Sequence, residues 1–172
     1  MGNHGATVPL GLHKTKFESL LERKGSILVK VVHELGSLNG AYHSTLEVST
    51  LRLFEPGNER NCTEGIKIEM REGQQEGHVS FLDMDEVGAL LSGLEYMVGS
   101  IARSIGYHGD YTETVFSTRG DFSVGFCLSD GKTQAFLKSG HKAFITAAVL
   151  PELALLLRAG QAHLAEAAGE VG

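Results

Sequence analysis

The sequence is poor in the residues that usually carry special chemistry. Its 172 residues include no Trp, two Cys and three Pro, and aromatic residues make up 7%. Cys62 and Cys127 lie far apart without the CxxC spacing of a metal site, which is typical of two free thiols. The eight His residues are scattered, and none forms the helical His pair of a zincin. We therefore expect no metal centre and no cofactor.

Positive charge is also scarce. The chain has 15 Lys and Arg residues against 21 Asp and Glu, a net charge of −6 at pH 7, and both halves are acidic. An acidic chain repels phosphate backbones at long range. Binding to a nucleic acid would therefore require a local basic patch.

Long apolar runs are missing as well. No stretch approaches the roughly 18–20 apolar residues that a membrane-spanning helix needs. Residues 1–25 contain no charged-then-apolar signal segment. These two features predict a cytoplasmic protein with no membrane partner.

Catalytic motifs are equally hard to find. Hydrolysis by Ser or Cys needs a nucleophile on a turn beside a His base, whereas Cys127 lies between apolar neighbours in a strand-like segment. The acidic run 83–86 has the Asp-x-x-Glu pattern of a helix capping box, which explains it better than paired-carboxylate catalysis. We expect no enzyme. The remaining catalytic alternative, a centre at His78 and His141, has no substrate that the sequence indicates.

What the sequence does contain is a run of strands followed by one amphipathic helix, and this pattern occurs twice. Residues 1–25 are interpreted as an N-terminal arm with a short helix over 14–24. Alternating apolar residues predict strands at 26–35, 42–54, 66–71 and 78–82, and an apolar stripe predicts a helix over 84–104. Strands at 112–118, 122–128, 132–137 and 141–146 and a helix over 147–167 follow.

This order predicts an α+β fold of the form ββββα-ββββα, built from antiparallel strands. We expect units 26–105 and 106–172 to pack as one compact domain. Asn39-Gly40 is a strong hairpin signal and predicts the turn between the first two strands.

The two units also share a register. At a constant offset of 63 residues, His78 corresponds to His141, Phe81 to Phe144 and Leu94 to Leu157. This favours an internal duplication, although any two strand–helix junctions resemble each other to some extent.

One strand of the second unit has the composition of a binding surface. Lys132, Gln134, Phe136 and Lys138 alternate on one face, Lys142 and Phe144 can share that face on the next strand, and Arg119 follows at a nearby turn. Cations among exposed aromatic rings suit single-stranded nucleic acid, because the cations follow the backbone while bases stack on the rings. Alternatively, Phe136 and Phe144 face the helix as core and the lysines only keep the rim soluble.

The element order over residues 26–166 resembles that of the Whirly-type, transcriptional-coactivator-like single-stranded DNA-binding superfamily. A TATA-binding-protein-like saddle is a second duplicated sheet-plus-helix layout. The Whirly resemblance implies curved antiparallel sheets that bind single strands, and helices that drive oligomerisation.

Two functions remain open at this point. The first is a non-catalytic protein that binds single-stranded DNA or RNA through Arg119, Lys132, Gln134, Phe136, Lys138 and Lys142. The second is a homo-oligomeric scaffold or protein-interaction module without a nucleic-acid role. For the expected homo-oligomer, the apolar helix stripes supply the interface residues Leu94, Ile101, Leu157 and Leu164.

Overall fold

The computed structural model describes residues 14–103 and 109–170. Its elements follow the predicted order: α1 (Lys16–Leu21), β1 (Val29–Asn39), β2 (Ser44–Phe54), β3 (Thr63–Glu72), β4 (His78–Asp83), α2 (Met84–Ala102), β5 (Tyr111–Ser117), β6 (Phe122–Ser129), β7 (Lys132–Ser139), β8 (His141–Ile145) and α3 (Val149–Glu170), with a short 3-10 helix at Glu59–Asn61. The α+β fold of form ββββα-ββββα is confirmed. The predicted boundary between the units, at 105–106, lies outside the described residues, as do positions 1–13 of the predicted arm.

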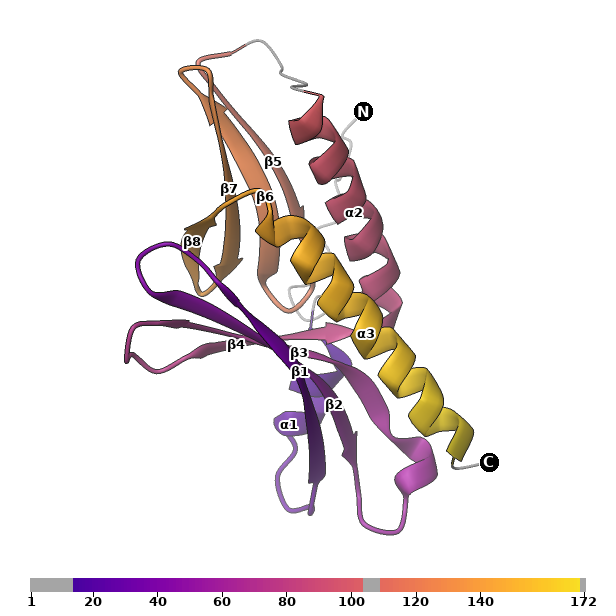
Figure 1. Cartoon of the computed structure of the whole chain (residues 1–172). Helices are drawn as coiled ribbons and strands as arrows, with labels where there is room; N and C mark the ends of the chain where they lie inside the picture. Colours follow the sequence, from indigo (N-terminus) through magenta and orange to yellow (C-terminus); the bar gives the residue numbers. More distant parts are fainter. Residues whose placement is uncertain (1–13, 104–108, 171–172) are drawn as a thin grey trace, which may run out of the picture.

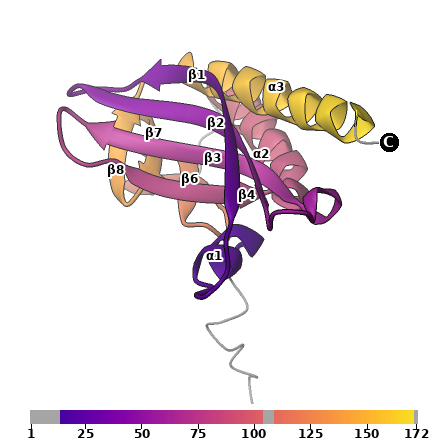
Figure 2. The same cartoon turned by 90° about the horizontal axis from the view of Figure 1, so that it is seen from below.

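The strands form two four-stranded antiparallel sheets, β1–β4 (sheet A) and β5–β8 (sheet B), each in chain order. The strands of the two sheets run in clearly different directions, and α2 and α3 lie side by side along one side of both (Figure 1). A view from below shows sheet A between α1 on one side and the two long helices on the other (Figure 2). On the sides turned away from α2 and α3, sheet A therefore has α1 beside it, whereas sheet B has no helix (Figures 1 and 2).

The faces of both sheets that meet α2 and α3 form one shared core. Alternate residues of β2, β3, β6 and β7 point into it, as the period-two pattern predicts. Leu94 of α2 and its counterpart Leu157 of α3, 63 residues later, are both fully buried. The core residues supplied by the sheets include Leu46, Val48, Ile66, Ile68, Val124, Phe126, Leu137 and Ile145.

On the opposite face of sheet A, its outer face, α1 covers the end near Leu51, Leu53 and Phe81. Thr15 forms a capping box with Glu18, so the helix begins at Lys16 and is shorter than the predicted 14–24. Phe17 is fully buried and stacks on Phe81 of β4, with ring centroids 5.6 Å apart. Its ring lies over Gly65, where an added Cβ would meet the ring at 2.4 Å. Glycine at this position lets α1 dock on the sheet.

The first hairpin differs from its prediction. β1 has a bulge between Glu34 and Gly36 and ends at Asn39, Gly40 still donates its N–H to the Ser44 carbonyl at 2.8 Å, and the chain turns at Tyr42 and His43. The Ser44 N–H donates to the Ala41 carbonyl at 3.1 Å, and the two residues between them have positive φ angles, 55° at Tyr42 and 61° at His43. This is the backbone of a type I′ turn, which Asn-Gly normally occupies. For residues with a Cβ the left-handed conformation costs about 1–2 kcal/mol each.

The start of α2 joins three segments of the chain. Asp83 is the N-cap residue, and its capping box with Glu86 confirms the structural interpretation of this acidic run. The buried Asp83 carboxylate also accepts the Lys16 N–H at 3.0 and 3.1 Å, so it ties α1 to α2. No helix among the described residues combines the length and the apolar character needed to cross a membrane.

Candidate functional site

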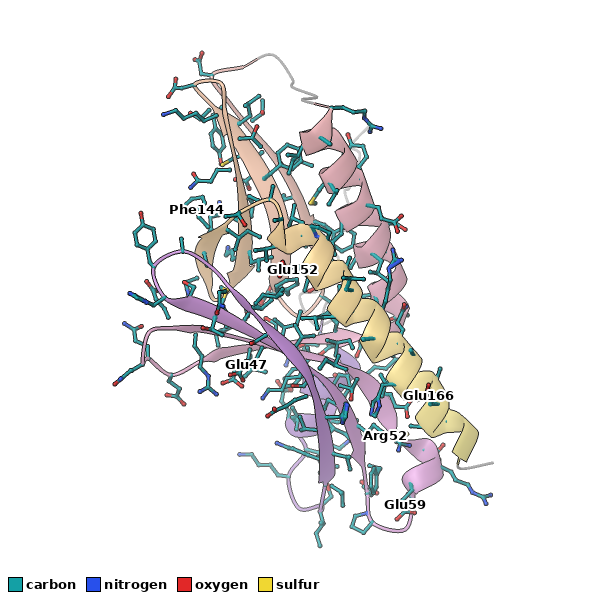
Figure 3. All side chains as sticks on the ribbon, viewed as in Figure 1. Glu47, Arg52, Glu59, Phe144, Glu152 and Glu166 are labelled. Carbon is teal, nitrogen blue, oxygen red and sulfur yellow. The ribbon has the colours of Figure 1, made fainter. Side chains whose placement is uncertain are left out.

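The outer face of sheet B, turned away from α2 and α3, collects the side chains that the sequence singled out. Lys138 pairs with Lys142, and Phe136 pairs with Phe144, so these four side chains share one face of β7 and β8. Figure 3 shows Phe144 on sheet B, beside the tip of the β1–β2 hairpin and away from α3. Antiparallel pairing therefore brings together residues from two strands, as expected. Lys132, Gln134 and Lys138 are exposed.

Phe136 lies on this face, but its ring is not available for stacking. It is only 1% exposed and passes over Gly125 of β6, where an added Cβ would meet the ring at 2.7 Å. The Lys142 ammonium lies 4.1 Å above the ring centroid, in cation–π geometry. The expectation of an exposed ring at Phe136 is therefore wrong, and so is the alternative that it faces the helices. Phe144 is half-buried.

A carboxylate from the far edge of the sheet reaches the same cluster. Glu113 of β5 accepts a hydrogen bond from the Tyr111 hydroxyl at 2.5 Å and one from the Lys142 ammonium at 3.3 Å. These two bonds, together with the charge of Lys138, lower the pKa of Glu113. Glu113 is therefore ionised at neutral pH and neutralises part of the positive charge of Lys142.

We expect Tyr111 to titrate abnormally because of this contact. Its hydrogen bond to the ionised Glu113 raises the pKa of Tyr111 to about 12 from 10.0. Removing the carboxylate charge with Glu113→Gln should return this pKa to near 10. The measurement is a pH titration of the Tyr111 Cζ resonance by NMR, in the unaltered chain and in Glu113→Gln. If Tyr111 titrates at the same pH in both proteins, the Tyr111–Glu113 contact is wrong.

The outer faces of the two sheets differ in charge. On sheet B the strands present Lys132, Lys138 and Lys142 against the single carboxylate Glu113. On sheet A, Glu69 forms ion pairs with Lys67 at 2.8 Å and with Arg71 at 2.6 Å, and these contacts lower the pKa of Glu69. The outer face of sheet A therefore has mixed charge and is covered by α1 at one end, whereas that of sheet B has an excess of exposed lysine.

Arg119 is not part of this face. It lies at the β5–β6 turn, where its guanidinium bonds to Asp85 and lies 3.4 Å from Glu86 and 3.7 Å from Asp83. Its backbone N–H donates to Glu86 at 2.7 Å. Its charge is already matched by the carboxylates at the start of α2, so the prediction that Arg119 contacts a ligand is corrected. Arg119 of the second unit thus forms ion pairs with the start of α2 in the first unit.

Two exposed aromatic residues beside the lysines have no signal in the sequence: Tyr111 of β5, which is 55% exposed and in register with Lys132 through Ser129, and Tyr42. Tyr42 is 82% exposed at the tip of the β1–β2 hairpin. The preceding residue, Ala41, donates its N–H to the Phe144 carbonyl on the edge of β8 at 2.9 Å. The hairpin of the first unit thus meets the edge of sheet B at β8. The position of Tyr42 beside sheet B depends on a contact between residues about a hundred positions apart, Ala41 and Phe144. No local sequence pattern predicts that contact.

The predicted oligomer interface is also corrected. Leu94 and Leu157 are fully buried, Leu164 is 3% exposed, and Ile101 packs against the same core. These side chains fill the space between the helices and the sheets of their own chain. They cannot contact a second copy without opening that core.

The solvent side of α2 and α3 carries a different apolar feature. A shallow groove of about 490 Å³ lies between the helices, and Leu155 at its side is 67% exposed. Glu95 and Arg158 border the groove and form an ion pair across it. They are the only Asp, Glu, Lys or Arg residues of α2 from 87 to 102 and of α3 from 153 to 165. Exposed helix faces are normally rich in charge.

His78 and His141 begin β4 and β8, at the place where the two sheets meet. An added Cβ at Gly140 would lie 2.6 Å from the His78 ring, and His141 Nε2 lies 3.7 Å from a Glu72 carboxylate oxygen. Both histidines therefore pack at the junction of the sheets.

The chain was compared with known proteins at three levels. No protein-family model, no curated protein and no solved structure matches it.

Proposed function

We propose that this protein binds single-stranded nucleic acid, without catalysis, across the outer face of sheet B. The observation that carries the proposal is the excess of exposed lysine on a sheet face that the described part of the chain leaves uncovered. One end of the equivalent face of sheet A is occupied by α1, through the stacking of Phe17 on Phe81, the counterpart of Phe144. The rest of that face carries charges of both signs, paired with one another, and so offers no excess of lysine.

The spacing of the cations suits a phosphate backbone. Lys132 and Lys138 begin and nearly end β7, so they are separated by about 20 Å at roughly 3.3 Å per residue. Lys142 lies directly across from Lys138 on β8. A local row of lysines attracts a polyanion even though the whole chain is acidic, because salt screens charges beyond about 10 Å.

The test is binding of fluorescein-labelled oligo-dT and oligo-U of 20 nucleotides by fluorescence anisotropy at about 0.1 M salt, where charges more than about 10 Å apart are screened. We expect binding at micromolar protein or below. The double variant Lys132→Glu with Lys138→Glu should lose at least about tenfold in affinity, and its log–log salt slope should fall by about 1.4 because two phosphate contacts are removed.

Lys30→Glu is the matched control, because Lys30 is an exposed lysine on β1 of sheet A. It changes the net charge in the same direction as either single substitution and should have little effect on affinity. No binding by the unaltered protein would overturn the proposal. If Lys30→Glu and Lys138→Glu lost the same amount of affinity, the effect would be due to net charge alone. That result would also contradict the proposal.

A second candidate function is assembly with a second copy of this chain through the outer sides of α2 and α3. The apolar groove and its nearly uncharged surroundings favour it. The two charged residues that line the groove, Glu95 and Arg158, are opposite in sign, so in a two-fold dimer each can pair with its opposite on the other copy. Such assembly would leave the outer face of sheet B free, so the two functions are compatible.

A further inference from the structure

The β1–β2 hairpin tip holds an aromatic side chain in water on a strained backbone. Tyr42 and His43 both adopt left-handed conformations that glycine or asparagine occupies more readily. Tyr42 is 82% exposed, and no residue in 14–103 or 109–170 stacks on its ring. Strained backbone conformations persist where the surrounding structure holds them, often at binding sites.

The surroundings hold this turn against the binding face. Ala41 donates to the Phe144 carbonyl at 2.9 Å, and the His43 carbonyl accepts the Gly73 N–H from the β3–β4 hairpin at 3.1 Å. The turn is thus fixed on both sides, once by sheet B and once by sheet A. Lys142, two residues before Phe144, lies on the outer face that the turn borders.

We propose that Tyr42 is a base-stacking residue, which receives one nucleobase while Lys138 and Lys142 contact the neighbouring phosphates. This inference rests on the proposed function and names the residue that contacts a base in that function. A flat, exposed ring at the edge of a lysine face has the chemistry that a nucleobase recognises, since every base offers a π-face. Because stacking is tolerant of sequence, the site would favour bases over an empty sugar-phosphate chain and show little preference among them.

The experiment compares two probes of equal length and charge, labelled oligo-dT of 20 nucleotides and a 20-unit abasic oligonucleotide. The unaltered protein should bind oligo-dT more tightly than the abasic strand. Tyr42→Gly should weaken oligo-dT binding by about 5- to 150-fold, the range for loss of one base stack, and leave abasic binding unchanged. Tyr42→Phe keeps the ring and should bind as the unaltered protein does.

Two further measurements separate stacking from damage to the turn. Tyr42→Gly relieves the strain at a positive φ, so its melting temperature should equal or exceed that of the unaltered protein. His43→Gly relieves the same strain at the next residue but keeps the tyrosine, and it should bind oligo-dT normally.

The outcomes distinguish the two levels of the proposal. If the unaltered protein binds neither probe, the proposed function fails and Tyr42 has no base to stack. If it binds both probes equally, or if Tyr42→Gly binds oligo-dT as tightly as the unaltered protein, the binding face stands and the role of Tyr42 is overturned.

Discussion

Replacing Asp83 by alanine is expected to lower the free energy of unfolding by about 2 to 4 kcal/mol. The Asp83 side chain is 2% exposed, it begins the capping box of α2, and it lies 3.7 Å from Arg119 of the second unit. The variant loses a helix cap, worth about 1 kcal/mol, and leaves the partly buried Lys16 N–H without its acceptor, which costs about 1 to 3 kcal/mol. Urea unfolding followed by circular dichroism measures the loss.

Asp85→Ala is the matched control for this variant. Asp85 also bonds to Arg119, but its side chain is 58% exposed. Exposed ion pairs contribute about 0–1 kcal/mol, so this variant should remain close to the unaltered protein. Similar losses for Asp83→Ala and Asp85→Ala would show that the buried contacts of Asp83 do not join the segments as described.

Two leucines on α3, two positions apart, should respond in opposite ways to a glutamate. Leu157 is fully buried, so Leu157→Glu places a carboxylate in the core and is expected to unfold the chain, with a loss of more than about 4 kcal/mol. Leu155 is 67% exposed beside the α2–α3 groove, so Leu155→Glu should change folding stability by about 0.5 kcal/mol or less. If copies assemble through this groove, Leu155→Glu should convert the oligomer to monomer.

Thermal melting and light scattering after size-exclusion chromatography separate these effects. A folded Leu157→Glu protein would contradict the packing of α3 in the core. A molar mass that is the same for the unaltered protein and for Leu155→Glu would contradict assembly through the groove and would leave the fold as described.

The sequence was sufficient for the fold because the fold depends on local periodicity. Alternation of apolar residues identified all eight strands, and the apolar stripes identified both long helices, since each element hides one face from water. The capping box at Asp83 was also readable, because its two residues lie three positions apart. The predicted helix over 84–104 ends at Ala102, which is a small difference at a helix end.

The candidate site was only partly predictable, because alternation gives the face of a side chain but not what covers it. Phe136 is on the predicted face, yet Gly125 below it and Lys142 above it enclose the ring. Arg119 is close in sequence to the second unit's strands, but a contact with α2 determines its role. Tyr42 became part of the site only when its hairpin met β8. These are long-range contacts, and one sequence carries no local signal for them.

The apolar stripes of the two long helices likewise do not show what they pack against. A stripe of leucines has the same pattern whether it packs against its own sheet or against another copy. In this fold the sheets take Leu94, Leu157 and Leu164, and the exposed sides of the helices retain Leu155.

The most direct test of the nucleic-acid proposal is a backbone amide NMR titration of the isotope-labelled protein with oligo-dT of 20 nucleotides. The largest shift changes are expected in β7, in β8 and in the turn at residues 41–44, with little change in α1 and in the strands of sheet A. Changes confined to α1, to the β1–β2 strands or to the α2–α3 groove, or no changes at all, would contradict binding at the outer face of sheet B.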